Sequence, residues 1–437
     1  MNAGIDRVIT TVREVLTESQ ALKGQILVGL SGGMDSVVLL HALTRLQKSE
    51  GHAFTLSAVH VHHGMSPNAD QWADFCQALC QEMQVPCQVV RVQMDMTRGK
   101  GVEQAAREAR YRAFEQAFGD VLCLGHHQND RAETLLLNLF RGAGIKGLAG
   151  LPASRAIGEK RLLRPLIELP RKDIQAWALA HGLQWIDDES NDDLRFRRNY
   201  IRHRVIPAVR DVFPGAVSVL ARTASQMSAY SQLLDRLAEI DARGCVDQKG
   251  FLQASKLALL PESALANLLR HRLNLAGISL PSQRRMQALC QQLKRVDKSS
   301  EILVRMGDVG CYVWRNSLWL DRSLKTPQPE ACPIASGLFD YPDGRLEIRQ
   351  GAEDLTQHGL TLSPLGIGNR FQPQGRCRDS VSELLRASGI PPWIRPRLPA
   401  IWQGTRLLWL PELGWAADAD VATGLFLNWQ PVLLQKL

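Results

Sequence analysis

Short apolar runs and longer amphipathic stretches alternate along the first half of the chain. Apolar runs of strand length occupy residues 25–30, 56–61, 87–92 and 121–124, and stretches with helical spacing occupy 5–16, 35–43, 69–83, 102–118 and 133–140. Strands that are separated by helices favour a parallel sheet with helices on both faces. Several runs are apolar on both sides, as a buried parallel sheet requires. We therefore expect an α/β domain over residues 1–215.

The pattern changes near residues 207–214. Leu and Ala then recur at helical spacing to about Ala276, which predicts a mainly helical domain over residues 216–325 with two short strands between Glu301 and Trp319. A Pro-rich stretch from Thr326 to Pro333 predicts a linker. The remainder combines short strand patterns with many Trp and Pro residues, and we expect a small α+β domain over residues 334–437.

Composition narrows the class of protein. Of the 437 residues, 45% are hydrophobic and 22% are charged, as in ordinary soluble globular proteins. The net charge of +8 favours a polyanionic partner such as nucleic acid, although a basic surface can also serve solubility alone. Nine scattered cysteines without a CxxC pair fit a reducing cytoplasm. Because no apolar run approaches the ~20 residues that span a bilayer, we expect a cytoplasmic protein with no membrane partner.

A glycine-rich segment follows the first predicted strand and opens a helix. It reads Ser31-Gly-Gly-Met-Asp-Ser36. Glycines let the backbone approach a phosphate, and the N–H groups of the helix that follows point at the anion. Asp35 would repel phosphate, and a bound Mg²⁺ would reconcile the two charges. The segment matches neither a Walker A loop nor a Rossmann fingerprint. The alternative interpretation is a plain glycine turn with a helix cap.

Two further segments place polar side chains after predicted strands or on helices. His60-Val-His-His-Gly64 follows the second strand, where a nucleotide-pocket loop competes with a zinc site whose ligand spacing is missing. Arg107 and Arg110 share one face of a predicted helix. That face could meet phosphate or nucleic acid, or it could be a solvated face paired with neighbouring glutamates.

Two carboxylates and a group of arginines complete the candidate chemistry. Asp130 and Glu133 lie three residues apart at a predicted helix start, so they project from one side and could hold Mg²⁺ or an ammonium group. Helix capping is the alternative interpretation. Arg198 and Arg202 belong to an arginine-rich segment that suits phosphate, although neighbouring aspartates could pair with it internally.

These segments resemble a known family. The SGGxDS pattern is similar to that of the PP-loop ATP pyrophosphatases, which cleave ATP between its α and β phosphates. Within that superfamily the chain resembles the tRNA(Ile)-lysidine synthetases, through His127, Asp130, Glu133 and Thr134 of an HxxDxxET-like element in which Asn129 replaces the first of two adjacent aspartates. Further matching segments are 141–148, 164–166, 187–191, 198–202, 369–373, 382–385, 390–395 and 398–399. The resemblance covers nearly the whole chain and is most specific over residues 25–205.

The resemblance implies a function. Members of this family convert the wobble cytidine of a CAU-anticodon tRNA(Ile) into lysidine, consuming free L-lysine and ATP with Mg²⁺ through an adenylated tRNA, and releasing AMP and pyrophosphate. It implies an ATP-binding catalytic domain over 1–215 and tRNA-contacting domains over 216–325 and 334–437. Self-association into a homodimer stays open.

The resemblance also implies roles for individual residues. ATP binding falls to Ser31, Gly32, Gly33, Met34, Asp35, Ser36 and His60. Catalysis falls to Asp35, His127, Asp130, Glu133 and Arg202, with Asp35 and Asp130 as metal ligands. Contacts to tRNA fall to Arg107, Arg110, Arg198, Arg370 and Arg395.

Three other functions compete with this one. A PP-loop tRNA thiolase would need a sulfur-carrying cysteine pair or an iron–sulfur site, and only Cys123 lies near the candidate centre in sequence. A glutamine-dependent synthetase would bring a further domain with a nucleophilic cysteine, which the sequence does not suggest. A catalytically silent RNA-binding protein would keep the fold without consuming ATP.

Overall fold

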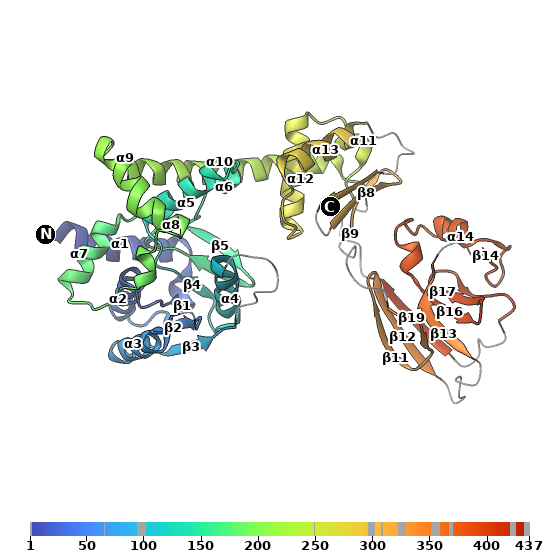
Figure 1. Cartoon of the computed structure of the whole chain (residues 1–437), viewed down its shortest axis with the longest axis horizontal. Coiled ribbons are helices and arrows are strands. Elements are labelled where there is room, and N and C mark those ends of the chain that lie inside the picture. Colours follow the sequence, from blue (N-terminus) through green and yellow to red (C-terminus); the bar gives the residue numbers. More distant parts are fainter. Residues whose placement is uncertain are drawn as a thin grey trace. The chain divides into compact units, whose positions relative to one another are not determined.

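The chain folds into two compact units, residues 1–233 and 234–437 (Figure 1). The computed structural model describes residues 2–64, 66–93, 102–248, 250–295, 302–306, 309–321, 329–350, 359–366, 370–419 and 425–431. No helix among these residues is long and apolar enough to cross a membrane.

A six-stranded sheet organises the first unit. Its order is β3-β2-β1-β4-β6-β5, and all neighbours pair in parallel except the antiparallel pair β5–β6. The strands are β1 (Gln25–Gly29), β2 (Thr55–His62), β3 (Cys87–Arg91), β4 (Val121–Cys123), β5 (Ser154–Ile157) and β6 (Lys160–Leu163). The predicted parallel sheet is confirmed, whereas the β5–β6 hairpin has no counterpart in the prediction, because two four-residue strands carry too short a pattern.

Helices cover both faces of this sheet, as predicted. They are α1 (Asn2–Glu18), α2 (Met34–Ser49), α3 (Ala69–Glu82), α4 (Val102–Gln116), α5 (Gln128–Phe140), α6 (Ile145–Leu148) and α7 (Arg171–Ala180). The predicted helix at 133–140 begins earlier, at Gln128, because polar residues fill its first turn. Helix α7 was not predicted from the apolar pattern.

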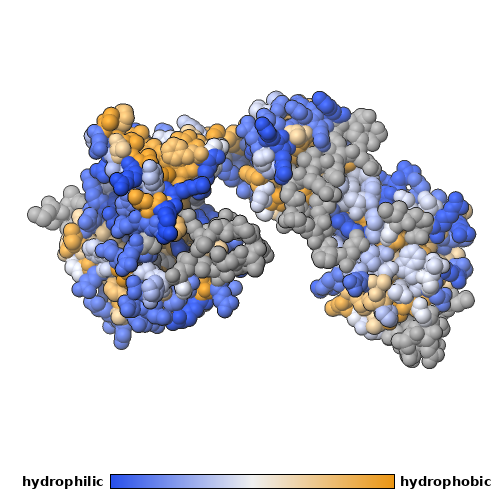
Figure 2. Space-filling view, viewed as in Figure 1, coloured by the Kyte–Doolittle hydropathy of each residue, from blue (hydrophilic) through white to orange (hydrophobic). Residues whose placement is uncertain are grey.

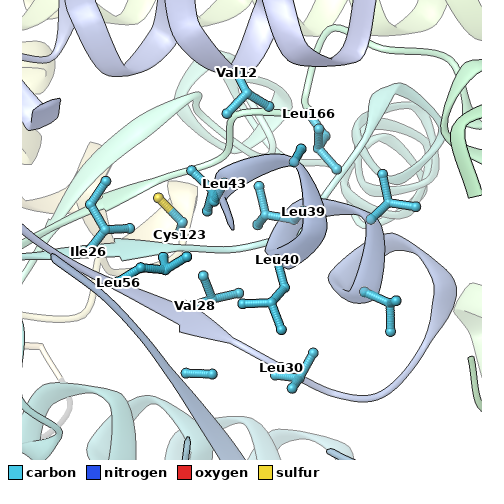
Figure 3. Close-up of a cluster of buried hydrophobic side chains, with 14 of the residues drawn as sticks. Val12, Ile26, Val28, Leu30, Leu39, Leu40, Leu43, Leu56, Cys123 and Leu166 are labelled. Carbon is cyan, nitrogen blue, oxygen red and sulfur yellow. The ribbon is translucent and has the colours of Figure 1, made fainter. Parts of the chain in front are cut away.

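Alternate residues of the strands enter two separate cores. Ile26, Val28 and Cys123 point to the side of α1, α2 and α7, where Leu39, Leu40 and Leu43 of α2 pack on them (Figure 3). Leu27 and Leu122 point to the opposite side, against Phe114 of α4. Both faces of each central strand are therefore buried, and the polar ends of the strands are where functional groups can gather.

A helical segment follows the sheet and packs on α5. It consists of α8 (Arg197–Tyr200), a π-helical turn (Ile201–Val205) and α9 (Ile206–Val212). Ile201 and Ile206 bury against Leu136 of α5. The long helix α10 (Ala216–Cys245) comes next and contains the division between the two units. Figure 2 shows apolar surface over α9 and α10, where Val212, Phe213 and Val219 are exposed.

The first part of the second unit is helical with a small sheet. Helices α11 (Ala254–Leu257), α12 (Glu262–Leu275) and α13 (Gln283–Lys294) share one core with the sheet. The sheet has three strands, β7 (Ile302–Met306), β8 (Val309–Trp314) and β9 (Ser317–Asp321). The prediction of two strands was therefore wrong, because the short turns between them hid one strand boundary.

Strands dominate the rest of the second unit. They are β10 (Cys332–Pro333), β11 (Gly337–Tyr341), β12 (Gly344–Gln350), β13 (Leu360–Pro364), β14 (Arg370–Phe371), β15 (Asp379–Ser380), β16 (Pro399–Gln403), β17 (Arg406–Leu410), β18 (Gly414–Trp415) and β19 (Leu425–Pro431). Helix α14 (Val381–Ala387) is capped by Ser380, whose hydroxyl accepts a bond from the Glu383 N–H. These elements confirm the predicted α+β character.

A buried ion cluster ties together three segments of the second unit. Arg397 donates to Asp321 at the end of β9 and to Asp343 in the turn before β12, at 3.0–3.1 Å. All three side chains are at most one-tenth exposed. Tyr312 of β8 stacks on Trp393, which lies shortly before Arg397 in the sequence, with ring centres 4.0 Å apart. Removing Arg397 would take away a guanidinium that contacts both buried carboxylates.

Replacing Arg397 with methionine should therefore destabilise the second unit strongly. We expect a loss of about 3–5 kcal/mol in the free energy of unfolding, the usual cost of breaking a buried ion pair from one side. Chemical denaturation of the full chain measures it. Arg345→Met is the matched control, because Arg345 pairs with Asp340 on the surface and should leave the transition unchanged. Equal effects of the two substitutions would contradict the assignment.

Candidate functional site

The phosphate-loop segment lies between β1 and α2, as its sequence predicts. Ser36 in the first turn of α2 donates to the Gly33 carbonyl at 2.9 Å, and its oxygen accepts the Ser31 N–H at 3.2 Å. The two hydroxyl oxygens are 3.1 Å apart. The loop is thus braced by its own serines, and the N-terminal N–H groups of α2 open toward the carboxyl edge of the sheet.

Gly32 has neither the backbone conformation nor the space for a side chain. Its φ is +85°, and a Cβ there would lie 2.6 Å from Ile186 and 3.3 Å from the sulfur of Cys76. The Ile186 N–H also donates to the Gly32 carbonyl at 2.9 Å. Ile186 and Cys76 therefore pack against the loop at Gly32 and hold its backbone in place. No sequence motif marks either residue for this role.

His60 supports the loop from the neighbouring strand. It is buried in β2, and its Nδ1 lies 2.9 Å from the Leu30 carbonyl oxygen, so Nδ1 carries the proton and donates. Burial lowers the pKa of His60, which keeps the ring neutral. His62 is also buried and lies 3.2 Å from Asp70 instead. Among the described residues no group of three or more His, Cys, Asp or Glu side chains could hold a metal ion.

His127 stands between two aspartates at the start of α5. Its Nε2 is 3.5 Å from Asp35 Oδ2, and its Nδ1 is 3.6 Å from Asp130 Oδ2. Burial disfavours the charged ring, but Asp130 and Asp35 outweigh it and raise the pKa of His127 above its usual value. The same imidazole helps Arg198 to lower the pKa of Asp130 against its own burial. Asp35 and Asp130 therefore favour the protonated form of His127, an imidazolium between two carboxylates.

Two arginines close the other side of the cluster. Arg202 forms a bidentate pair with Glu133, with its Nε 2.7 Å from Oε1 and its NH2 3.0 Å from Oε2. Arg198 joins the two acids, from Nε to Glu133 Oε2 at 2.8 Å and from NH2 to Asp130 Oδ1 at 2.7 Å. The Glu133 side chain is 1% exposed, so its charge is neutralised almost entirely by these guanidiniums.

The local helix geometry allows both arginines to reach the carboxylates. Arg198 lies in α8 and Arg202 in the π-helical turn that continues it. Both elements pack on α5, which carries Asp130 and Glu133. Wider π turns are often found where a functional side chain must be re-aimed. The structure thus brings together five residues predicted as catalytic: Asp35, His127, Asp130, Glu133 and Arg202.

Asn129 points away from this cluster. Its amide oxygen accepts a bond from the backbone N–H of Arg171, the first residue of α7, at 3.4 Å. An asparagine can fill this acceptor role as an aspartate would. Asn129 in place of the family's aspartate therefore changes the charge near α7, while Asp130 and Glu133 keep their own partners.

Asp35 fits a divalent cation better than Asp130 does. Asp35 Oδ1 is buried without a hydrogen-bond partner, which leaves a carboxylate oxygen beside the phosphate loop for Mg²⁺. Both oxygens of Asp130 accept hydrogen bonds, Oδ1 from the Arg198 guanidinium and Oδ2 from the backbone N–H of His127. Asp130 is therefore less available to a cation than Asp35. Mg²⁺ usually takes one or two carboxylates, phosphate oxygens and water, which this donor set can provide.

Cys123, the cysteine nearest to the candidate centre in sequence, does not offer the sulfur chemistry of a thiolase. Cys123 lies in the buried core, and burial raises the pKa of its thiol to about 12. All nine cysteines are free, without a bonded pair. A thiol that is buried and protonated cannot carry sulfur to a substrate.

The residues predicted to contact tRNA fall in both units. Arg107 and Arg110 lie in α4, and Arg198 pairs with the acids described above. Arg370 is exposed in β14 of the second unit. Arg395 is half-buried and donates to the Ile390 carbonyl and the Ser382 hydroxyl of its own unit. Arg395 therefore holds local structure, while Arg107, Arg110 and Arg370 are accessible.

Family models match three stretches of the chain. A PP-loop domain matches residues 6–209, a TilS substrate binding domain matches 252–319, and a TilS substrate C-terminal domain matches 360–429. The first covers the phosphate loop and the carboxylate–arginine cluster.

Whole-chain relatives agree with these models. A tRNA(Ile)-lysidine synthase of Azoarcus sp. is 39% identical, covering 90% of this chain and 88% of the relative. That of Escherichia coli O157:H7 is 33% identical, covering 92% and 93%. Among solved structures, the U34-tRNA thiolase NcsA from Methanococcus maripaludis is 19% identical with a TM-score of 0.44, covering 52% of this chain and 80% of that one, a likeness too low to carry an argument.

Gly125, two residues after β4, offers a direct test of the site geometry. A Cβ on Gly125 would lie 2.7 Å from the Asp35 carbonyl oxygen and 3.0 Å from the Ser36 nitrogen. Gly125→Ala must therefore shift the first turn of α2. We expect ATP affinity to fall roughly tenfold to a hundredfold, as small displacements of positioned groups do. Isothermal titration with ATP measures it. Gly244→Ala, which has nothing within 4 Å, is the control, and unchanged affinity in Gly125→Ala would refute the close packing.

Proposed function

Because the chain belongs to the tRNA(Ile)-lysidine synthase family, we propose that it adenylates the wobble cytidine of tRNA(Ile) and then couples lysine to that base. It is an ATP-using PP-loop ligase that forms lysidine on tRNA(Ile). The observation that carries the stepwise mechanism is the pair of buried acids, Asp130 and Glu133, linked through His127 to Asp35 beside the phosphate loop.

The first step is adenylation of the base. The loop from Ser31 to Ser36 binds the ATP phosphates through its hydroxyls and the N-terminus of α2. The cytosine O2 attacks the α phosphorus, forming a P–O bond while the bond to pyrophosphate breaks. Mg²⁺, when bound at Asp35, supplies positive charge to the phosphates. His60 keeps the loop in position by holding the Leu30 carbonyl.

The second step joins lysine to the activated base. The ε-amine attacks C2, and AMP leaves with the former O2. The ammonium group of lysine must lose a proton before or during this attack. Glu133 is the residue that we assign to orienting the amine, with Asp130 beside it and His127 as the weaker candidate. The proton of the ammonium group passes to a carboxylate of this pair, because His127 already carries a proton. Positive charge on Arg202 stabilises the phosphate that departs.

Arginines have to exchange partners for lysine to enter. Arg198 and Arg202 already neutralise Asp130 and Glu133, so an incoming ammonium group competes with two guanidiniums. Phosphates of ATP or tRNA are the natural alternative partners for those guanidiniums. Contacts to tRNA at Arg198 therefore depend on this exchange, whereas Arg107, Arg110 and Arg370 can meet RNA directly.

Several finer features belong to the same proposal. The CAU anticodon and Mg²⁺ follow from the family resemblance, and Arg395 contributes to the tRNA surface by holding its own loop in shape. A cytoplasmic location follows from a tRNA substrate. Self-association into a homodimer stays a prediction.

Labelled lysine tests the proposal. Purified protein is incubated with ATP, Mg²⁺, radiolabelled lysine and either CAU-anticodon tRNA(Ile) or a methionine tRNA. We expect stable label on tRNA(Ile) alone, and a loss of at least a hundredfold in Asp35→Asn, because removing one charged group from a phosphate-transfer site typically costs about 10²–10³ in rate.

Omitting lysine separates the two steps. Pyrophosphate release that depends on tRNA should persist without lysine for a single turnover. Arg13→Gln is the matched control, because Arg13 pairs with Glu50 on the surface away from the loop. Pyrophosphate release without lysine incorporation at any lysine concentration would keep the PP-loop chemistry and reject lysine as the nucleophile.

A further inference from the structure

Arginines gather around Tyr111 of α4. The guanidinium carbons of Arg107 and Arg155 lie 5.3 and 4.6 Å from the centre of its ring. Arg155 and Arg164 also interact electrostatically with the Tyr111 hydroxyl. Arg155 comes from β5 and Arg164 follows β6, so the cluster joins a helix to the edge hairpin of the sheet. We call Arg107, Arg110, Arg155 and Arg164 with Tyr111 the Tyr111 cluster.

Arg164 anchors the Tyr111 cluster from inside the fold. It is 1% exposed and donates to the Pro152 carbonyl at 2.6 Å and to His126 Nδ1 at 3.2 Å. Burial, with help from Arg155 and Arg107 and against Tyr111, lowers the pKa of Arg164 to about 10. Arg110 similarly donates to a neutral partner, His63 Nε2, at 3.2 Å. These guanidiniums are held by neutral acceptors instead of by carboxylates.

Among the side chains that the structure describes, the positive charge of the Tyr111 cluster is not paired with a carboxylate. Within the described part of the chain, no carboxylate lies within ion-pair distance of its four arginines. By contrast, Arg7, Arg13 and Arg91 of the same unit each pair with an acid. Burial opposes ionisation of Tyr111, but Arg107, Arg155 and Arg164 outweigh it and lower the pKa of the phenol. Such a cluster would gain stability from a bound anion.

The Tyr111 cluster borders the reaction centre. His126, which accepts from Arg164, directly precedes His127, and His63 directly follows β2. Both therefore lie at the carboxyl edge of the sheet, where ligands of open α/β sheets bind. The ATP phosphates have their own site in the loop at the start of α2. A second phosphate site at this edge would hold a nucleotide chain whose base reaches the reacting α phosphorus.

We propose that Arg107, Arg110 and Arg155 bind a backbone phosphate of the tRNA anticodon loop next to the reacting base. This inference rests on the proposed function, and it adds Arg155 and Tyr111 as positioning residues for the RNA substrate. Tyr111 and Arg164 keep the guanidiniums of α4 and β5 together, so that the site is preformed. Guanidinium forks match phosphate oxygens, and such contacts fix the register of RNA without reading its sequence.

Arg155→Gln tests the proposal with little risk to folding, because Arg155 is exposed. Binding of CAU-anticodon tRNA(Ile) is measured by filter retention over a range of salt concentrations. We expect affinity to fall roughly tenfold, and the slope of log K against log salt to shrink by about 0.7–0.9, the value for one lost phosphate contact. Arg13→Gln, whose guanidinium is paired with Glu50, should match the wild type in both.

Two further measurements separate the outcomes. Tyr111→Phe should weaken tRNA binding in the same direction but less, because it removes the hydroxyl that interacts with Arg155 and keeps the ring on which Arg155 lies. In the lysine-incorporation assay, Arg155→Gln should raise the KM for tRNA and leave the KM for ATP unchanged. Unchanged tRNA affinity and salt slope in Arg155→Gln would overturn the proposal, as would a raised KM for ATP alone, which would assign the cluster to nucleotide phosphate. A wild type that binds tRNA but adds no lysine would instead reject the proposed function.

Discussion

Burying two carboxylates side by side is the constraint on which the site depends. Asp130 and Glu133 project from one turn of α5 into a region with little water, where uncompensated charges are very costly. Arg198, Arg202 and His127 supply the compensation from separate elements. The helical segment after residue 196 is therefore held against α5 by charge as well as by the apolar contact of Ile201 with Leu136. The π-helical turn follows from the same need, since it aims Arg202 at Glu133.

This arrangement connects two chemistries that one enzyme must keep in register. Asp35 belongs to the phosphate loop, where ATP is bound, and His127 links it to the acids that we assign to the lysine amine. A guanidinium that leaves Glu133 for a phosphate frees a carboxylate for the ammonium group. In the proposed mechanism, arrival of a polyanion and opening of the lysine site are thus one event in electrostatic terms. The positive charge of the Tyr111 cluster at the same edge offers the RNA chain a fixed point.

Much of this could be predicted from sequence, and the misses have physical reasons. The phosphate loop and the pairing of Asp130 with Glu133 follow from local spacing, which a helix converts directly into geometry. Arg198 was predicted as a tRNA contact, but its partners lie some 65 residues away in sequence, which spacing cannot reveal. The β5–β6 hairpin is too short for a periodic pattern, so the sequence predicts neither the hairpin nor a role for Arg155 within it. Ile186 and Cys76, which enclose Gly32, look like any other apolar residues in the sequence.

The central claim is that the acids and arginines of the site act as one unit. A double-mutant cycle on Glu133 and Arg202 tests it, with Glu133→Gln, Arg202→Met and the double variant compared by kcat/KM for lysine. Residues that work as a unit are grossly non-additive, so we expect the double variant to lose about as much as the worse single variant. Losses that multiply, with coupling below about 0.5 kcal/mol, would show that the two side chains act independently and would contradict the account.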